Sequence, residues 1–150
     1  MIWLALTILA PLGAGLTALA ARRAPEAIAL AGAALGLAGA LRLFAGAAGG
    51  AEVTAALPFL PDLPVRLAAG PLTATLALTV ATVSAMVLTY AAGYMARDPE
   101  RPRFFGTMLM FVAAMQLLVL SGDWITLLAA WEMIGFASYL LIGFWHRREG

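Results

Sequence analysis

A glutamate, Glu132, interrupts one of the most apolar stretches of this chain, the segment WEMIGFASYLLIGFW at residues 131–145. An ionised acid near the middle of a membrane-spanning helix costs roughly 2.5–3.5 kcal/mol, so it persists only where protein or water faces it. Removal from water favours the neutral carboxyl group, whereas a neighbouring cation favours the ionised form. A carboxylate held between these two influences can bind and release a proton, which is the chemistry of a proton relay.

The depth of Glu132 supports this interpretation. In a helix spanning residues 124–145, Glu132 lies about 2.5 residues, or roughly 4 Å, from the midpoint. Three polar side chains are candidate partners: Gln116 in the preceding apolar segment, and Ser138 and Tyr139 in the same one. A hydrogen bond to one of them would give Glu132 a packing role instead. Because acids within membrane helices mark functional sites by default, the relay is the preferred hypothesis.

The composition indicates a membrane protein. Hydrophobic residues make up 63% of the 150 residues and charged residues 11%, whereas soluble domains are about half apolar. The chain has no cysteine and one histidine, which excludes disulfides, haem-attachment motifs and thiolate-bound metal centres. We therefore expect no cofactor, no metal site, and no redox or catalytic site in this chain. No basic run is long enough to indicate nucleic-acid binding.

Five apolar segments separated by charged islands predict an all-α polytopic membrane protein with a single membrane domain at 1–150. Lipid-exposed backbone must satisfy its own hydrogen bonds, so we expect each segment to be a helix. The expected spans are about 2–20, 27–45, 72–95, 104–121 and 124–145, with an outer loop at 46–70. The first span could also be a signal peptide, but arginines follow it rather than precede it, which favours a retained helix.

The arginines predict the orientation in the membrane. All nine basic residues are arginine, and one orientation places seven of them on the same side: residues 22, 23, 97, 101, 103, 147 and 148. The positive-inside rule then puts the N-terminus outside and the C-terminus inside, and we expect a bacterial inner (plasma) membrane. His146 would lie at the inner surface, either as a proton-entry group or, preferably, as an interfacial end group.

Three further segments have interpretable patterns. The sequence PFLPDLP at 58–64 predicts an extended, polyproline-like connector, with a proline-motif ligand as the alternative. Gly32, Gly36 and Gly39 indicate close helix packing in general, with a specific partner helix as the alternative. The hydroxyl residues of the third span predict either side chains bonded to their own helix or a wet face that lines an ion path.

The second half of the chain resembles a known family. The run Arg103–Phe105, then Trp131-Glu132, then SYLLIGF at 138–144 is similar to the antiporter-like L subunit (chain 5 type) of respiratory complex I, the NADH–quinone oxidoreductase. The large subunits of multisubunit cation/proton antiporters and related membrane-bound hydrogenase subunits share this pattern more loosely. The resemblance covers residues 70–150 well, whereas the first 50 residues match only in hydropathy.

The resemblance implies a role for Glu132 in proton translocation, paired with a lysine on a later helix. It also implies subunits of about fourteen helices, built from two inverted repeats. This sequence departs from the family at two points. The aspartate usual at the entry of the third helix is replaced by AAGP at 68–71, and the chain contains no lysine. We therefore expect the partner lysine to come from elsewhere in the assembly.

Three hypotheses about function follow. The chain is the N-terminal portion of a proton-translocating subunit in a complex I-type assembly, or a small multi-pass structural or assembly subunit of an antiporter-like complex, or a gene fragment. Both H⁺ and Na⁺ are compatible with the pattern. The expected partners are the lipid bilayer and other membrane subunits, one of which supplies an intramembrane lysine, and no nucleic acid.

Overall fold

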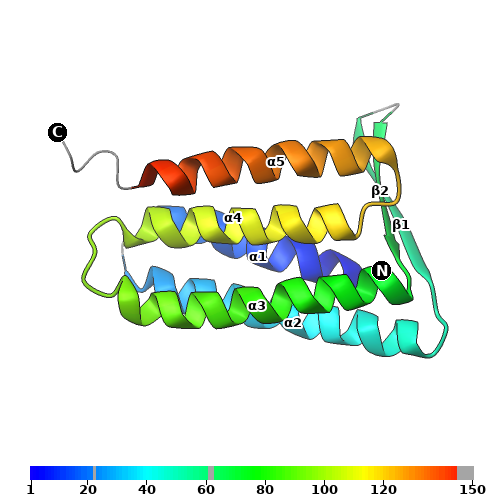
Figure 1. Cartoon of the computed structure of the whole chain (residues 1–150), viewed down its shortest axis with the longest axis horizontal. Coiled ribbons are helices and arrows are strands. Elements are labelled where there is room, and N and C mark those ends of the chain that lie inside the picture. Colours follow the sequence, from blue (N-terminus) through cyan, green and yellow to red (C-terminus); the bar gives the residue numbers. More distant parts are fainter. Residues whose placement is uncertain (22, 61–62, 145–150) are drawn as a thin grey trace.

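The computed structural model describes residues 1–21, 23–60 and 63–144, which form five long helices and one β-hairpin (Figure 1). The helices are α1 (Ile2–Ala20), α2 (Pro25–Ala48), α3 (Pro71–Tyr94), α4 (Arg101–Val119) and α5 (Trp124–Ile142). The strands are β1 (Val53–Leu60) and β2 (Leu63–Ala69). The hairpin lies across the end of the bundle at which α5 begins.

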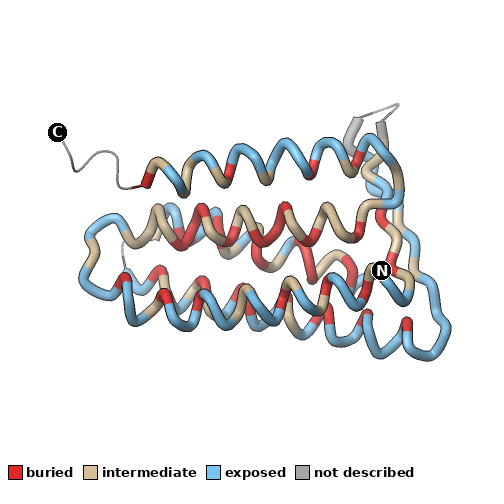
Figure 2. The backbone as a smooth tube through the Cα atoms, viewed as in Figure 1, coloured by how far each residue is buried: buried red, intermediate tan, exposed pale blue. Residues whose placement is uncertain are grey.

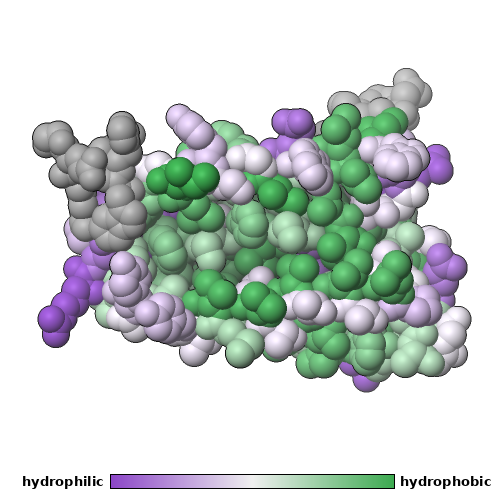
Figure 3. Space-filling model, in the orientation of Figure 1, coloured by the Kyte–Doolittle hydropathy of each residue, from purple (hydrophilic) through white to green (hydrophobic). Residues whose placement is uncertain are grey.

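All five helices are long and apolar enough to cross a membrane. They contain 19 to 24 residues, which corresponds to about 29–36 Å of helix and matches the ~30 Å hydrocarbon layer. Hydrophobic side chains dominate the middle of the face in Figure 3, and most hydrophilic side chains lie toward its two ends. The predicted all-α, five-span membrane fold is thereby confirmed.

Helix α4 is the centre of the bundle. It packs against α1, α2, α3 and α5, and Figure 2 shows buried residues along most of its length. Helix α5 lies at the edge of the bundle, where it packs against α4 and, near its start, against β2. The Phe105 and Leu109 side chains of α4 are fully buried in a cluster with residues of α1, α2 and α3. Helix α5 is therefore held mainly from one side.

The glycines of α2 bring it close to α1. A Cβ atom added at Gly39 would lie 2.6 Å from the Thr7 hydroxyl and 3.0 Å from the Thr7 backbone nitrogen. Gly32 and Gly36 similarly face Ala14 and Pro11. Small residues allow such close backbone approach where hydrophobic burial provides no drive. The glycines therefore pack within the chain, which confirms the prediction of general helix packing.

The hydroxyl residues of α3 bond mainly to their own helix. Thr75, Thr79, Thr82 and Thr89 each donate a hydrogen bond of 2.7–2.9 Å to the carbonyl oxygen four residues earlier. Their polar groups are satisfied without water or a partner, so these residues can be exposed on a lipid-facing helix. For these four threonines, the first of the two sequence-based interpretations of this helix is confirmed.

The connector between α2 and α3 differs from the sequence prediction. We expected an extended, polyproline-like connector. The segment is extended, but it forms two strands, β1 and β2, that pair in antiparallel register, from Val53 opposite Ala69 to Pro58 opposite Pro64. Proline lacks a backbone N–H and is excluded from central strands, but both strands of a two-stranded sheet are edge strands. Each proline can therefore direct its nitrogen away from the partner strand, and the extended segment folds back on itself.

Candidate proton-relay site

The start of α5 is fixed by its N-cap. The Asp123 Oδ1 atom accepts a hydrogen bond of 2.7 Å from the backbone nitrogen of Thr126. This bond holds the pKa of Asp123 below its ordinary value; the Thr126 hydroxyl and the charge of Arg66 act in the same direction, and burial opposes them. An aspartate at this position satisfies one of the free N–H groups of the first turn. Helix α5 therefore begins at a defined residue.

The β-hairpin holds the same end of α5. The Gly122 nitrogen donates to the Arg66 carbonyl oxygen at 2.8 Å, and the Arg66 nitrogen donates to the Thr126 hydroxyl at 3.1 Å. The Ala68 nitrogen donates to the Leu120 carbonyl oxygen at 2.8 Å. Strand β2 thus extends its pairing onto the α4–α5 turn. The Arg66 side chain adds a long ion pair of 3.8 Å with Asp123, which is exposed and therefore weak.

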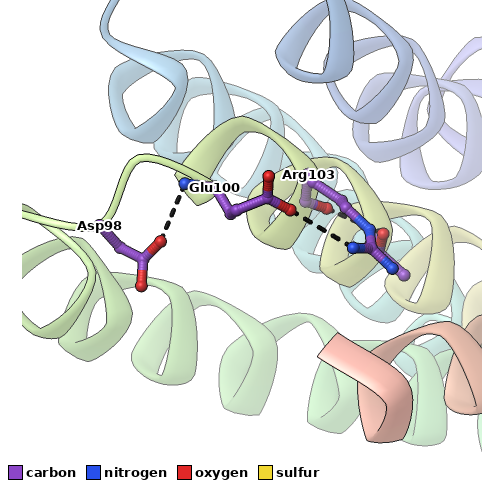
Figure 4. A network of polar contacts seen from close by, with 4 residues as sticks. Asp98, Glu100 and Arg103 are labelled. Atoms are coloured by element: carbon purple, nitrogen blue, oxygen red, sulfur yellow. Dashed lines mark hydrogen bonds and ion pairs between the residues drawn. The ribbon is translucent and has the colours of Figure 1, made fainter. Parts of the chain in front are cut away.

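The other end of α5 is held by aromatic contacts. The Phe144 ring packs edge-on against Phe104 of α4, with ring centroids 5.5 Å apart, and the Arg103 guanidinium lies 5.8 Å from the Phe144 centroid. Figure 4 shows that Arg103 also pairs with Glu100, at 3.3 Å, and that Asp98 accepts a hydrogen bond from the Glu100 nitrogen. The charged α3–α4 loop therefore helps to position the C-terminal end of α5.

Between its two ends, α5 makes few buried contacts. Its buried residues are Thr126, Ala130 and Ala137, two of which are small enough for close approach to α4. Glu132 is exposed and lines a surface groove together with Met110 of α4 and with Met133, Phe136 and Ala137 of α5. The carboxylate thus lies on a part of α5 that the described helices do not cover.

Glu132 makes no hydrogen bond or ion pair with any residue in the described part of the chain. Tyr139 lies seven residues later, hence on nearly the same face about two turns away, and it is 73% exposed. Ser138 lies on a different face and is half-buried. The structure therefore places Glu132 and Tyr139 on one uncovered face, and it does not join either of them to Ser138.

Gln116 faces the interior of the bundle instead. Its side chain is 1% exposed, and its Nε2 atom donates a hydrogen bond of 3.0 Å to the Ala77 carbonyl oxygen of α3. No bond between Gln116 and Glu132 is present among the described residues. His146 lies outside the described residues. Over residues 1–21, 23–60 and 63–144, no three histidine, cysteine, aspartate or glutamate side chains gather as a metal site would require.

Sequence reasoning missed two positioning residues, Arg66 and Thr126. The sequence Asp123–Thr126 carries a recognisable N-cap signal, an aspartate directly before an apolar helical run. This signal predicts where α5 begins. The backbone bonds of Arg66 have no comparable signal, because they depend on a strand pairing across more than fifty residues of sequence.

Comparison with known proteins supports the resemblance seen in the sequence. Residues 61–105 match the family described as NADH-Ubiquinone oxidoreductase (complex I), chain 5 N-terminus. The NADH-quinone oxidoreductase subunit L of Mycobacterium tuberculosis is 46% identical over 71 residues, which are 47% of this chain and 11% of that protein. The NADH-ubiquinone oxidoreductase chain 5 of Yarrowia lipolytica is 41% identical over 87 residues, which are 58% of this chain and 13% of that protein.

Solved structures share the fold over more than nine tenths of this chain. A chain of the Mrp complex from Dietzia sp. superposes with a TM-score of 0.78 and 27% identity, covering 93% of this chain and 16% of its own length. A chain of the archaeal membrane-bound sulfane sulfur reductase superposes with a TM-score of 0.81 and 23% identity, covering 92% of this chain and 22% of its own length. The predicted similarity to the N-terminal part of subunit L, and to the antiporter large subunits, is confirmed.

Proposed function

We propose that this chain is the N-terminal portion of a proton-translocating membrane subunit in an assembly of the NADH–quinone oxidoreductase type, with Glu132 as an intramembrane proton-relay carboxylate. Its curated relatives from Mycobacterium and Yarrowia are subunits of such oxidoreductases by name, and this chain spans about an eighth of their length. The chain is an integral membrane protein with five apolar helices, and it is similar to these subunits.

The observation that carries the proposal is the position of Glu132. Helix α5 comprises 19 residues, Trp124–Ile142, so its midpoint is Met133 and Glu132 lies about 1.5 Å from it along the axis. This is closer to the centre than the sequence-based span predicted. An ionised side chain exposed to lipid at that depth costs roughly 2.5–3.5 kcal/mol. Protein or water must therefore cover the Glu132 face in the assembly.

We propose that a lysine covers this face of Glu132, a role that the resemblance supports. A lysine from a later membrane helix, seated on the groove beside Met110 and Phe136, would favour the ionised form of Glu132. When the lysine charge moves or is neutralised, desolvation would favour the neutral acid, and Glu132 would take up a proton. We also propose that the N-terminus faces outward, so that Arg97, Arg101 and Arg103 lie on the inner side of a bacterial plasma membrane.

The test is Glu132→Gln in the assembled complex, reconstituted into vesicles. Glutamine keeps the size and hydrogen-bonding capacity of the side chain but cannot bind a proton. We expect proton uptake, followed with a pH-sensitive dye during turnover, to fall strongly while the subunit composition stays unchanged. Glu52→Gln is the matched control, because Glu52 is exposed in the loop before β1 and outside the helices. Its uptake should equal that of the wild type.

Two results would contradict the proposal in different ways. Wild-type proton uptake in Glu132→Gln would exclude a relay role for Glu132 while leaving the membrane subunit assignment intact. Loss of the subunit from the complex would show that Glu132 acts in helix packing, which was the alternative interpretation of this residue. The size of the assembly, measured by native gel electrophoresis, separates these outcomes.

A further inference from the structure

A small, mostly apolar cavity lies inside the bundle, away from Glu132, where α1, α2, α3 and α4 converge. The space open to the centre of a water-sized sphere is about 10 Å³. A cavity of that size holds one water molecule and nothing larger. Its lining is formed by Thr7, Pro11, Ala33, Gly36, Leu37, Ala81, Ser84, Val112 and Gln116. Three hydrogen-bonding residues, Thr7, Ser84 and Gln116, contribute to this lining.

The first of these groups is the Gln116 amide. Its Nε2 atom donates to the Ala77 carbonyl oxygen at 3.0 Å, and because a carbonyl can only accept, this bond fixes which end of the amide faces Ala77. The Oε1 atom therefore points elsewhere. It is buried and has no hydrogen-bond partner among the described residues. A buried acceptor without a partner costs roughly 1–3 kcal/mol, so a donor is expected beside it.

The second group is the backbone carbonyl of Thr7. Its normal partner in α1 would be the N–H four residues later, but that residue is Pro11, which has none. The Thr7 oxygen borders Gly36, where an added Cβ would lie 3.6 Å from it. Freed carbonyls of this kind in membrane helices are satisfied by neighbouring side chains or by ordered water. The Thr7 oxygen is thus a second acceptor in the cavity wall.

The third group is the Ser84 hydroxyl. Four threonines of α3 donate to their own helix, but Ser84 makes no hydrogen bond with any described residue. It is half-buried and lines the cavity. The wall therefore contains two acceptors in need of a donor and one hydroxyl able to donate.

We propose that one water molecule binds in this cavity, donating hydrogen bonds to Gln116 Oε1 and the Thr7 carbonyl oxygen and accepting one from the Ser84 hydroxyl. Three such bonds match the number that buried waters typically make. The water joins the proline-containing turn of α1 to α3 and α4. Because α4 is the helix on which α5 packs, this site lies behind the helix that supports Glu132, and it is independent of the proton-relay proposal.

X-ray radiolytic labelling of the native assembled protein tests the site, because hydroxyl radicals formed from a bound water modify the side chains beside it. Val112 lines the cavity and is 5% exposed, whereas Leu109, on the same helix, is fully buried and does not line the cavity. Leu109 should react only when the bundle opens locally, so we expect Val112 to be labelled at least about fivefold faster after correction for intrinsic reactivity. Labelling of Val112 no faster than that of Leu109 would overturn the proposal.

Two variants test the assignment of the polar groups. Gln116→Met keeps the length of the side chain and removes its polar atoms, so Val112 labelling should fall to the level of Leu109 while Leu109 is unchanged. Unchanged Val112 labelling in this variant would show that Gln116 does not bind the water molecule. Thr82→Val is the control, because that hydroxyl bonds to Leu78 on the exposed side of α3, and it should label like the native protein. A variant that unfolds is recognised by increased labelling of Leu109. In that case the proposal is judged by the ratio of Val112 to Leu109 labelling in the native protein.

Discussion

Two glycines in α2 provide a sharp test of how the bundle is held together. Gly39 contacts α1, and a Cβ atom there would lie 3.0 Å from both the Thr7 nitrogen and the Trp3 carbonyl oxygen. Ordinary contacts begin near 3.4 Å, so Gly39→Ala must separate two backbones by a few tenths of an ångström. Overpacking of this kind costs about 1–3 kcal/mol, partly offset by the roughly 0.5–1 kcal/mol that alanine gains over glycine in a helix.

The expected net loss for Gly39→Ala is therefore about 1–2 kcal/mol, or roughly a 5- to 30-fold increase in the unfolding equilibrium constant. Gly46 lies in the same helix with nothing within 4 Å of its would-be Cβ, so Gly46→Ala should gain stability by about 0.5–1 kcal/mol. Unfolding of the two variants in the same lipid nanodiscs, followed by tryptophan fluorescence, measures the difference. Equal stabilities would show that α1 and α2 do not pack as the structure places them.

Two further predictions concern the junction of hairpin and α5. Gly122→Ala places a Cβ atom 3.3 Å from the Arg66 carbonyl oxygen, which should weaken the Gly122–Arg66 hydrogen bond and cost about 1 kcal/mol of stability. The control is Gly93→Ala, whose added Cβ has no atom within 4 Å and should not destabilise the bundle. Equal unfolding midpoints for the two variants would refute the contact between Gly122 and Arg66. The pKa of Asp123 is lower in the folded protein than in the unfolded chain. The ionised Asp123 carboxylate therefore contributes its full stabilisation of the folded state above the unfolded-state pKa of about 3.9, and this contribution is lost as the pH falls through the folded-state pKa. Wild type should therefore exceed Asp123→Asn in stability at neutral pH and lose that advantage in acid, and a pH-independent difference would contradict this reasoning.

The sequence predicts the membrane helices better than their ends. Hydropathy detects the part of a helix that lies in lipid, but α4 begins at Arg101 rather than near Phe104, and α2 begins at Pro25. In both cases a proline lies in the first turn, where its missing N–H is no loss and its fixed φ angle suits a helix. Charged residues that look like loop therefore extend the helix beyond the apolar segment.

The hairpin and the orientation of Gln116 were not predictable in the same way. Prolines at 58 and 64 argue against strands, and only the pairing of two edge strands makes them acceptable. Hydropathy places Gln116 within the fourth apolar segment, at a shallower depth than Glu132, but it does not indicate which neighbouring helix Gln116 faces. Since α4 is surrounded by four helices, that direction depends on the packing of all of them, and the structure directs Gln116 toward α3.

The way in which α5 is held explains how one helix can present a carboxylate to a partner. Its start is fixed by the Asp123 cap and by β2, and its end by the contact of Phe144 with Phe104. Between these points, the small side chains of Ala130 and Ala137 contact α4 and leave the opposite face open. Fixed ends limit tilting and sliding of the helix, so the depth of Glu132 is set before any partner binds. Under the proposed relay role, a partner helix would need to supply only a cation and protein that covers the exposed face of Glu132, because this chain already sets the position of that residue.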